Sequence, residues 1–315
     1  NIKQVEVTSL QPADTSTACA LDYNGNVTCW GSEQKDPILS TPSSIDGLTS
    51  VTSIAMNSNL LFALDSNANL TRWDGNSLTF LSSNVSSISD SGDCFINSSG
   101  DAECLVSEIG LSYYTIQSEG DNFIQLSNSC GLRASGKVGC WQTNDTIATN
   151  VINHEGELQN ITQLKGFCGL LNDNTVDCWS YSSGNLEYKV NVSPAIIDIS
   201  ELINTLPASV CGKSLSGELK CYGDSTNFGG VYGTSVPVEY SFKGYFTLQN
   251  GLPADSIKSA SIAGYSACAV LQDDTVSCWG ENYNGVLAEA PNAGLSHLEQ
   301  FILADPWLGA YQGPE

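Results

Sequence analysis

Apolar and polar residues alternate over short stretches of this chain, and the same alternation recurs in seven similar units. The first unit, residues 19–31, reads CALDYNGNVTCWG. Successive side chains of a strand point to opposite faces, so Cys19, Leu21, Val27 and Cys29 would share one face of a two-stranded hairpin. The pattern therefore predicts a β-hairpin with an apolar face and with a cysteine in each strand.

The loop of each predicted hairpin fixes its register. A three-residue loop needs a left-handed residue in its third place, usually Gly or Asn. In chain order, this third residue is Gly25, Ala68, Gly100, Gly136, Asn174, Gly217 and Asp274. The register that follows places the two cysteines of a unit directly opposite each other, at a separation that a disulfide accepts.

The hairpin units begin near residues 19, 62, 94, 130, 168, 211 and 268. In six of them two cysteines lie ten positions apart, and these six pairs account for all 12 cysteines. The predicted disulfides are Cys19–Cys29, Cys94–Cys104, Cys130–Cys140, Cys168–Cys178, Cys211–Cys221 and Cys268–Cys278. The second unit has Phe62 and Arg72 at these places, which we interpret as a decayed repeat.

A strand-like segment precedes every hairpin, as in residues 122–127 (NFIQLS) and 160–165 (NITQLK), and we expect a further short strand after it. Regularly spaced short strands with turns between them are typical of a closed all-β array. Repeats of this length indicate a solenoid or a propeller rather than several unlike domains. The 315-residue chain is therefore predicted to contain one all-β repeat domain.

The cysteines also indicate the compartment. Zinc-binding cysteines are usually two to four residues apart with histidines nearby, whereas this chain has a spacing of ten and only two histidines, His154 and His297. Disulfides persist in oxidising compartments. We therefore expect an extracellular protein, either secreted or at the cell surface.

The formal net charge of −23 limits the partners. A surface this acidic repels phosphate backbones, so we expect no nucleic-acid partner. No apolar stretch approaches the length of a transmembrane helix, so no membrane span is expected. Solubility is the simpler interpretation of the charge, and attraction of calcium is the sharper one.

Two hairpin loops have the alternating oxygen donors of a calcium-binding loop. These are Asp22-x-Asn24-x-Asn26 and Asp65-x-Asn67-x-Asn69. Both lack the distant bidentate glutamate of such a loop, and Asp and Asn are also the residues that tight turns prefer. We expect turn chemistry here and no bound metal.

Seven N-x-S/T sequons are possible sites of N-glycosylation in a eukaryotic secretory route, which would make carbohydrate an attached group. They begin at Asn26, Asn69, Asn84, Asn97, Asn144, Asn160 and Asn191. The last of them has Pro194 directly after its serine, which weakens it.

Catalytic motifs are not evident in the sequence. It contains no glycine-rich phosphate loop and no G-x-S-x-G elbow. A pair of carboxylates for glycoside hydrolysis stays open, because such pairs are recognised by geometry rather than by spacing. We expect no enzymatic activity, no catalytic residue and no cofactor.

The repeat itself resembles a known family. CALxxxGxVxCWG, followed after the last hairpin by GENYNGVLAEA, is similar to the repeats of the regulator-of-chromosome-condensation superfamily, which includes beta-lactamase inhibitory protein II and the ectodomains of plant crinkly-type receptor kinases. The resemblance covers nearly the whole chain and implies a seven-bladed β-propeller. The paired cysteines look most like those of the extracellular members, whose functions differ widely.

One departure from the repeat lies before the last hairpin. Residues 226–252 lengthen this interval and read in part VPVEYSFKGYFTL, which alternates like an added hairpin. An aromatic insertion on a propeller rim is a candidate contact surface, and covering a gap between blades is an equally good interpretation. The candidate interaction residues are Tyr240, Phe242, Tyr245 and Phe246.

The second departure is the C-terminal segment, residues 293–315, which we separate from the propeller at residues 1–292. Its LEQFILAD stretch resembles an eighth copy of the segment that precedes each hairpin. It either closes its own ring or pairs with a neighbouring molecule. The candidate interaction residues are Phe301, Leu303, Trp307 and Tyr311.

These observations together predict a non-enzymatic extracellular protein that acts through protein contacts. The first hypothesis is a structural subunit that associates with its own copies through the terminal strand into an oligomer or fibre. The alternative is a ligand-binding ectodomain or inhibitor-like module that uses the propeller face or the aromatic insertion.

Overall fold

The computed structural model describes most of the chain. The residues outside the description are 11–14, 34–35, 58–59, 107–111, 144, 154, 183–186, 207–208, 225–242, 248–251, 264–265 and 281–315. All regular structure elsewhere is strand, apart from one turn of 3₁₀ helix at Ala254–Ser256. The predicted all-β class is therefore confirmed for the described residues.

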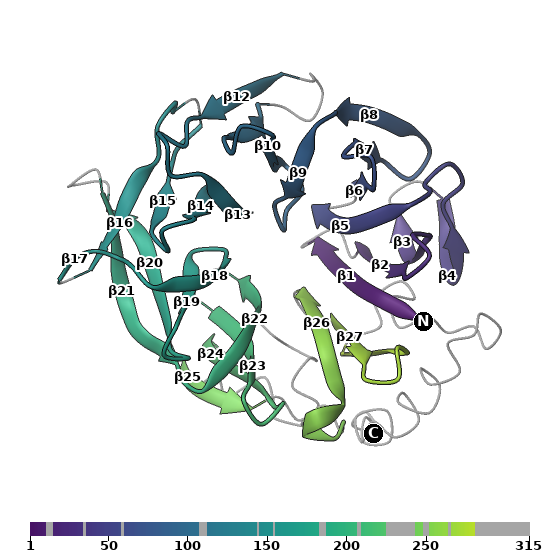
Figure 1. Ribbon diagram of the computed structural model, residues 1–315. Coiled ribbons are helices and arrows are strands. Elements are labelled where there is room, and N and C mark those ends of the chain that lie inside the picture. The colour runs from purple at the N-terminus through teal and green to yellow at the C-terminus, as the bar shows by residue number, and fades with distance from the viewer. Residues whose placement is uncertain are drawn as a thin grey trace. The chain divides into compact units, whose positions relative to one another are not determined.

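The first three sheets each have four antiparallel strands in chain order (Figure 1). The first contains β1 (Ile2–Leu10), β2 (Thr15–Asp22), β3 (Val27–Glu33) and β4 (Asp36–Ser44). The second contains β5 (Val51–Asn57), β6 (Leu60–Asp65), β7 (Leu70–Trp73) and β8 (Leu78–Ser82). The third contains β9 (Val85–Ile88), β10 (Cys94–Asn97), β11 (Ala102–Leu105) and β12 (Tyr113–Ile116).

The middle of the chain forms one larger sheet of nine strands. Its first half contains β13 (Phe123–Ser127), β14 (Cys130–Arg133), β15 (Val138–Cys140), β16 (Thr149–Asn153) and the short β17 (Gly156–Glu157). Its second half contains β18 (Ile161–Lys165), β19 (Cys168–Leu171), β20 (Val176–Ser182) and β21 (Glu187–Ile196).

Two further sheets complete the described chain. One contains β22 (Ile199–Leu206), β23 (Ser209–Ser214), β24 (Leu219–Asp224) and β25 (Lys243–Thr247). The other contains β26 (Ile257–Ala263), β27 (Ser266–Leu271) and β28 (Val276–Gly280). The chain divides into two compact units, one of residues 1–51, 206–211 and 216–315 and the other of residues 52–205 and 212–215.

The merged sheet differs from the separate blades that the repeat predicts. Its halves each have a strand, a hairpin and an outer strand, and they join because the outer strands β16 and β21 pair in parallel. The pairing is short, with Val151 opposite Tyr188 and Ile152 opposite Lys189. The architecture is a propeller-like series of small sheets, and the described strands form six sheets that contain seven hairpins.

The predicted hairpin register is confirmed. Cys19 lies opposite Cys29 and Cys268 opposite Cys278, and the same ten-residue separation holds for every disulfide. Phe62 lies opposite Arg72 in the unit that has no cysteines. The disulfides are Cys19–Cys29, Cys94–Cys104, Cys130–Cys140, Cys168–Cys178, Cys211–Cys221 and Cys268–Cys278.

The third residue of every hairpin loop has the predicted left-handed backbone. Four of these residues are glycines, which adopt a positive φ without a steric penalty. The φ angles are 83° at Gly25, 63° at Ala68, 84° at Gly100, 83° at Gly136, 67° at Asn174, 85° at Gly217 and 62° at Asp274.

The same loop residue also connects each hairpin to the strand that follows it. Its carbonyl oxygen accepts a hydrogen bond from the first backbone N–H of the strand that precedes the next hairpin, at 2.9–3.1 Å in six of the loops. The bonds run from Val51 to Gly25, Val85 to Ala68, Phe123 to Gly100, Ile161 to Gly136, Ile199 to Asn174 and Ile2 to Asp274. The last bond leads from the final hairpin back to the first strand, within the compact unit that contains both.

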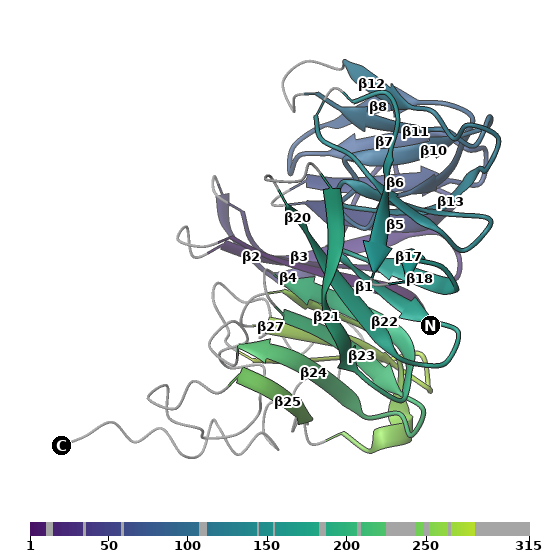
Figure 2. The same ribbon diagram turned by 90° about the vertical axis from the view of Figure 1, so that its left-hand side faces the viewer.

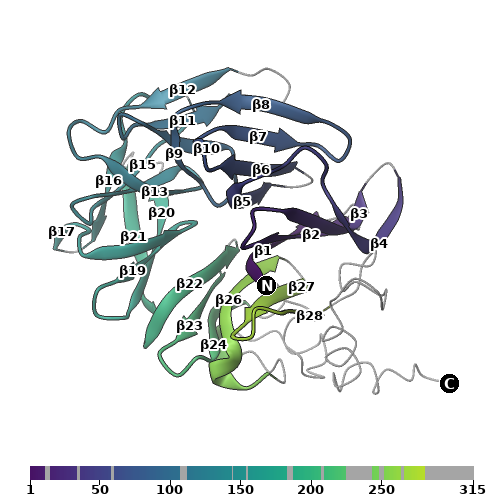
Figure 3. The ribbon, with the colours of Figure 1, turned by 45° about the vertical axis from the view of Figure 1, so that its right-hand side comes forward.

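Packing within the compact unit that contains residues 1–51 and 216–315 supports this connection. β1 packs against β26 and β27, and Figures 1 and 3 show β1 beside β26. The buried side chains between them include Val5, Trp30 and Val270 together with the Cys268–Cys278 disulfide. The backbone N–H of Val7 donates to Ser261 Oγ at 3.1 Å. The two ends of the described chain therefore share one apolar cluster.

Side-chain amides make an equivalent connection in the compact unit of residues 52–205 and 212–215. Gln125 donates through Nε2 to the carbonyl of Leu164 and accepts through Oε1 from the N–H of the same residue. Gln163 makes the same pair of bonds to Leu202. Each glutamine satisfies the N–H and the carbonyl of a residue in the strand that precedes the next hairpin. This pair of bonds fixes the spacing between the two strands.

No helix in the described part of the chain is long and apolar enough to cross a membrane.

The indole rings that follow the hairpins are mostly buried, as expected if sheets pack face to face. Trp30, Trp141, Trp179 and Trp279 are each at most 3% exposed.

Substituting the loop glycines tests the connection between hairpins. Gly136→Ala forces alanine into a left-handed conformation and should cost about 1–2 kcal/mol in unfolding free energy. Gly25→Ala adds a clash, because its methyl carbon would lie 2.7 Å from the Val51 nitrogen, whereas at Gly136 the nearest atom is 3.5 Å away. We expect it to cost a further 1–3 kcal/mol, roughly, as overpacking does.

Urea unfolding of the two variants beside the wild type measures both losses. Equal losses at Gly25 and Gly136 would mean that the backbone of residues 50–51 yields to the added methyl, and that the connection is not rigid.

Candidate interaction site

The predicted aromatic segment contributes an ordinary strand of the repeat. Residues Lys243–Thr247 form β25, which lies along β24 at the edge of its sheet (Figure 2). In this pairing Tyr245 lies opposite Tyr222 and Phe246 opposite Cys221. Part of the proposed insertion is thus the fourth strand of a sheet. The other candidate residues lie outside the described residues: Tyr240, Phe242, Phe301, Leu303, Trp307 and Tyr311.

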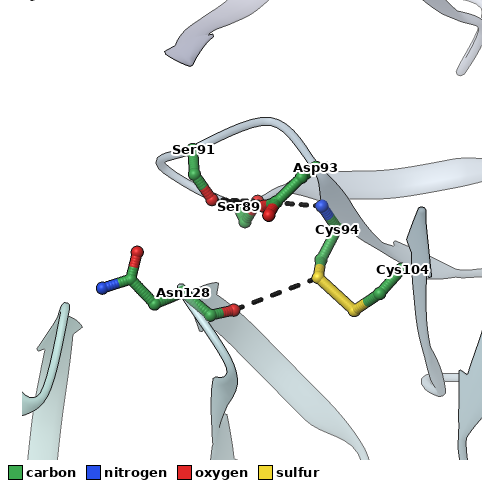
Figure 4. Close-up of a disulfide and its surroundings, with 6 residues drawn as sticks. All are labelled: Ser89, Ser91, Asp93, Cys94, Cys104 and Asn128. Atoms are coloured by element: carbon green, nitrogen blue, oxygen red, sulfur yellow. Dashed lines mark hydrogen bonds between the residues drawn. A yellow bond between two sulfur atoms is a disulfide. The ribbon is translucent and has the colours of Figure 1, made fainter. Parts of the chain in front are cut away.

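A cluster of short polar residues lies beside the Cys94–Cys104 disulfide, in the turn of residues 89–93 (Figure 4). Ser89 Oγ accepts from the backbone N–H of Cys94 at 3.2 Å, and the hydroxyls of Ser89 and Ser91 donate to Asp93 Oδ1. These bonds stay within the turn. The carboxylate of Asp93 therefore holds the turn in shape rather than facing a ligand.

The disulfide also approaches the next sheet. Cys94 Sγ lies 3.9 Å from the carbonyl oxygen of Asn128. Because an oxidised sulfur carries no proton, we regard this as a polar contact and not as a donated hydrogen bond.

A second polar group connects residues at or just after the ends of β9, β13 and β18, the strands that precede three consecutive hairpins. The hydroxyl of Ser127 donates to Asp90 Oδ2 and accepts from the N–H of Gly166, both at 2.5 Å. Lys165 Nζ lies 3.6 Å from Asp90 Oδ2. Ser127 is fully buried, so no substrate reaches its hydroxyl. This Ser–Asp–Lys combination is consequently an internal brace and not a nucleophilic site.

An exposed aromatic ring lies beside two charged groups where the loops of the first and last hairpins meet the start of β26. Lys258 Nζ lies 2.7 Å from Asp274 Oδ1, donates to the hydroxyl of Tyr23 and sits 5.0 Å from the centre of its ring. The ring of Tyr23 is 53% exposed. We call these three residues the Tyr23 cluster.

Electrostatics fix the charge state of the Tyr23 cluster. The hydrogen bond from Lys258 is the main cause that lowers the pKa of Asp274, and the same bond raises the pKa of Lys258. Both groups remain charged at neutral pH. Tyrosine is one of the residues that interface hot spots favour, and the Lys258 ammonium adds a cation–π contact to its ring.

The loop aspartates that suggested calcium are occupied by their own turns. Asp22 Oδ1 accepts from the N–H groups of Asn24 and Asn26, and Asp65 Oδ1 accepts from those of Asn67 and Asn69. Burial opposes ionisation of both carboxyls, but the hydrogen bonds outweigh it and lower their pKa values. Within the described residues, no group of three or more His, Cys, Asp and Glu side chains gathers as a metal site would need.

The sequons fall at different places in the repeat. Asn144 lies outside the described residues, as do the histidines His154 and His297. Asn26 and Asn69 are in hairpin turns, and Asn97 is the last residue of β10, directly before a hairpin turn; we call these three the hairpin-turn sequons. Asn84 and Asn160 directly precede the strands β9 and β18, and Asn191 is in β21.

Comparison with known proteins adds information on the fold. No protein-family model matches the chain, and no curated protein matches it. Among solved structures, yeast RCC1 (Prp20) bound to Kap60 aligns over 92% of this chain and 72% of its own, with 17% identity and a TM-score of 0.45. The entire ectodomain of the Physcomitrella patens receptor kinase CR4 aligns over 89% and 73%, with 14% identity and a TM-score of 0.49.

PorZ, described as an essential surface component of the type-IX secretion system of Porphyromonas gingivalis, aligns over 87% of this chain and 36% of its own. The identity is 13% and the TM-score 0.50. At these identities the likeness concerns the fold alone. The structural neighbours of this chain thus include yeast RCC1 (Prp20), a protein of the superfamily that the repeats resemble.

Removing a loop carboxylate tests the turn interpretation. Asp65→Ala should lower the unfolding free energy at neutral pH by about 1 kcal/mol, the usual cost of losing a side-chain acceptor for such backbone N–H groups. The pKa of Asp65 is lower in the folded protein than its ordinary value of 3.8. Its contribution is therefore complete above that value and is lost as the pH falls through the folded pKa.

Urea unfolding at about pH 7 and about pH 3 measures the difference between wild type and variant, which should shrink at the lower pH. Asp65→Asn retains the Oδ1 acceptor and should cost less at neutral pH. A difference of the same size at both pH values would show that the carboxylate charge has no part in the turn.

Proposed function

We propose that the protein is a secreted or cell-surface seven-bladed propeller that acts through protein contacts, without catalysis, and associates with its own copies. The six disulfides favour an oxidising compartment, because such bonds do not persist in a reducing one. The described chain offers buried polar braces and an exposed aromatic–charged cluster, which suit binding better than turnover.

The number of blades in this proposal is taken from the repeated unit rather than from the number of sheets. Each of the seven hairpins has a first strand before it, and the cyclic hydrogen bond from Ile2 to Asp274 continues the series without an added unit. In this proposal the nine-stranded sheet is two blades whose outer strands touch. The parallel pairing of β16 and β21 involves so few residues that it does not require a single blade.

The observation that carries the self-association is the edge of the last sheet. Among the described strands, β28 pairs with β27 alone, whereas β4, β8, β12 and β25 each add a fourth strand to their sheets. An edge strand offers its backbone groups to a further strand. We propose that the strand-like part of residues 293–315 fills this edge on a neighbouring copy.

The charge of the chain adds a condition to this proposal. Copies with a formal charge of −23 repel each other at long range, so association depends on short-range backbone and apolar contacts. Added salt screens the repulsion. Assembly by strand addition should therefore strengthen as the salt concentration rises, opposite to an association held by ion pairs.

The second candidate function is binding of a different protein through the Tyr23 cluster. It is favoured by the exposure of Tyr23 beside a fixed ion pair. A stable monomer that binds a partner, and loses it with Tyr23→Ala, would support this alternative over self-association.

Deletion of residues 293–315 tests the primary proposal. The native chain should form oligomers or fibres that grow with salt, and the deletion should leave monomers that keep the fold. Light scattering and electron microscopy measure both. A shorter deletion of residues 306–315 is the matched control, because it keeps the LEQFILA stretch and should still assemble. A native chain that is monomeric at every salt concentration, or assembly that survives the longer deletion, would refute the proposal.

A further inference from the structure

The side-chain amides of the hairpin-turn sequons already donate hydrogen bonds to carboxylates. Asn26 Nδ2 donates to Asp22 Oδ2 at 2.9 Å, and Asn69 Nδ2 donates to Asp65 Oδ2 at 3.0 Å. Asn97 Nδ2 donates to Glu103 Oε1 at 2.8 Å.

Each of these nitrogens is thus held against a carboxylate, and Asn69 and Asn97 are also half-buried. A sugar on such a nitrogen crowds the carboxylate and competes with the turn for the amide.

Asn84 and Asn160 have a different environment. Each is exposed and directly precedes a first strand, in left-handed backbone with φ of 60° and 64°. The neighbouring backbone is fixed, because the N–H groups of Val85 and Ile161 donate to the loop carbonyls of the preceding hairpins. Within the described residues neither amide side chain makes a hydrogen bond. The two asparagines thus project from a rigid backbone with an available Nδ2.

The hydroxyl of each sequon has a structural partner that does not involve the asparagine. Ser86 Oγ donates to the carbonyl of Ile96 and Thr162 Oγ1 to that of Leu170, both at 3.1 Å. Thr52 makes the same bond to Leu64 in a sheet without a sequon at this place. The strand therefore needs the hydroxyl, and the amide of the asparagine remains free to carry a modification.

We propose that Asn84 and Asn160 are N-glycosylated and that the hairpin-turn sequons are not. In the transfer, a bond forms between Nδ2 and the anomeric carbon of a lipid-diphosphate-linked oligosaccharide, and the bond from that carbon to the diphosphate oxygen breaks. The electron pair leaves with the lipid diphosphate, and one amide proton passes to solvent. This inference rests on the secreted location in the proposed function.

Both glycans would stand at the same end of their sheets. The bonds from Val85 to Ala68 and from Ile161 to Gly136 place each asparagine next to a hairpin loop. The oligosaccharides would therefore cover the loops of residues 66–68 and 134–136, which excludes these loops from contact with a protein partner. The outer strands of the same sheets would stay accessible.

Site-resolved mass spectrometry of the chain secreted from a eukaryotic cell line tests this inference. Enzymatic removal of glycans in heavy-oxygen water converts each modified asparagine into a labelled aspartate. We expect the label at Asn84 and Asn160 and its absence at Asn26, Asn69 and Asn97. Asn84→Gln and Asn160→Gln should each remove one glycan step in electrophoretic mobility, whereas Asn97→Gln should remove none.

Ser86→Ala and Ser86→Thr provide a matched pair at one site. The alanine variant loses the glycan at Asn84, and the threonine variant keeps both the sequon and the hydroxyl and retains it. A secreted chain with unmodified Asn84 and Asn160, or with glycans at Asn69 and Asn97 instead, would overturn the inference and leave the proposed contacts untouched. Retention in the cell with reduced cysteines would overturn the inference and the secreted location together.

Discussion

The hydrogen bond that a strand's first N–H donates to the loop carbonyl of the preceding hairpin, observed for six of the seven hairpins, is the constraint on which the rest of the structure depends. In all six cases the accepting residue is the third loop residue, whose backbone is left-handed. The same residue closes a three-residue loop, and this loop sets the hairpin register. The register in turn places the two cysteines opposite each other, as at Cys19 and Cys29. One local backbone requirement thus determines the turn, the disulfide and the connection between units.

The disulfides also act as buried apolar groups, in addition to restricting the conformations of the unfolded chain. Each closes a short loop and contributes about 2–3 kcal/mol in the chain-entropy model. The Cys130–Cys140 and Cys94–Cys104 bridges lie inside apolar clusters, beside Leu132 and Ile96 respectively. In the unit without cysteines, the buried ring of Phe62 is part of the corresponding cluster. The ring of Phe62 therefore supplies apolar contacts at the place where the other six hairpins have a disulfide.

The sequence was sufficient to predict the features that depend on nearby residues. Hairpin register, cysteine pairing and the left-handed loop residues all follow from spacings of ten residues or fewer, and the structure confirms them. The joining of two units through β16 and β21 was not predictable, because backbone pairing between outer strands leaves no pattern in either one. The Tyr23 cluster was missed for a related reason: Tyr23 and Lys258 are distant in sequence, and only closure of the repeat brings them together. The alternation around Tyr245 indicated a strand, but its role as the fourth strand of a sheet depends on its pairing with β24.

In the proposed assembly, β28 at the edge of the last described sheet pairs with a strand from a neighbouring copy. Electron cryo-microscopy of the purified native protein tests this claim most directly, because it resolves the number of blades and the strand beside β28 in one experiment. We expect seven blades in each copy and, along β28, a strand that comes from an adjacent molecule. Single copies in which β28 is covered by the same chain, or a repeat that closes with a different number of blades, would contradict it.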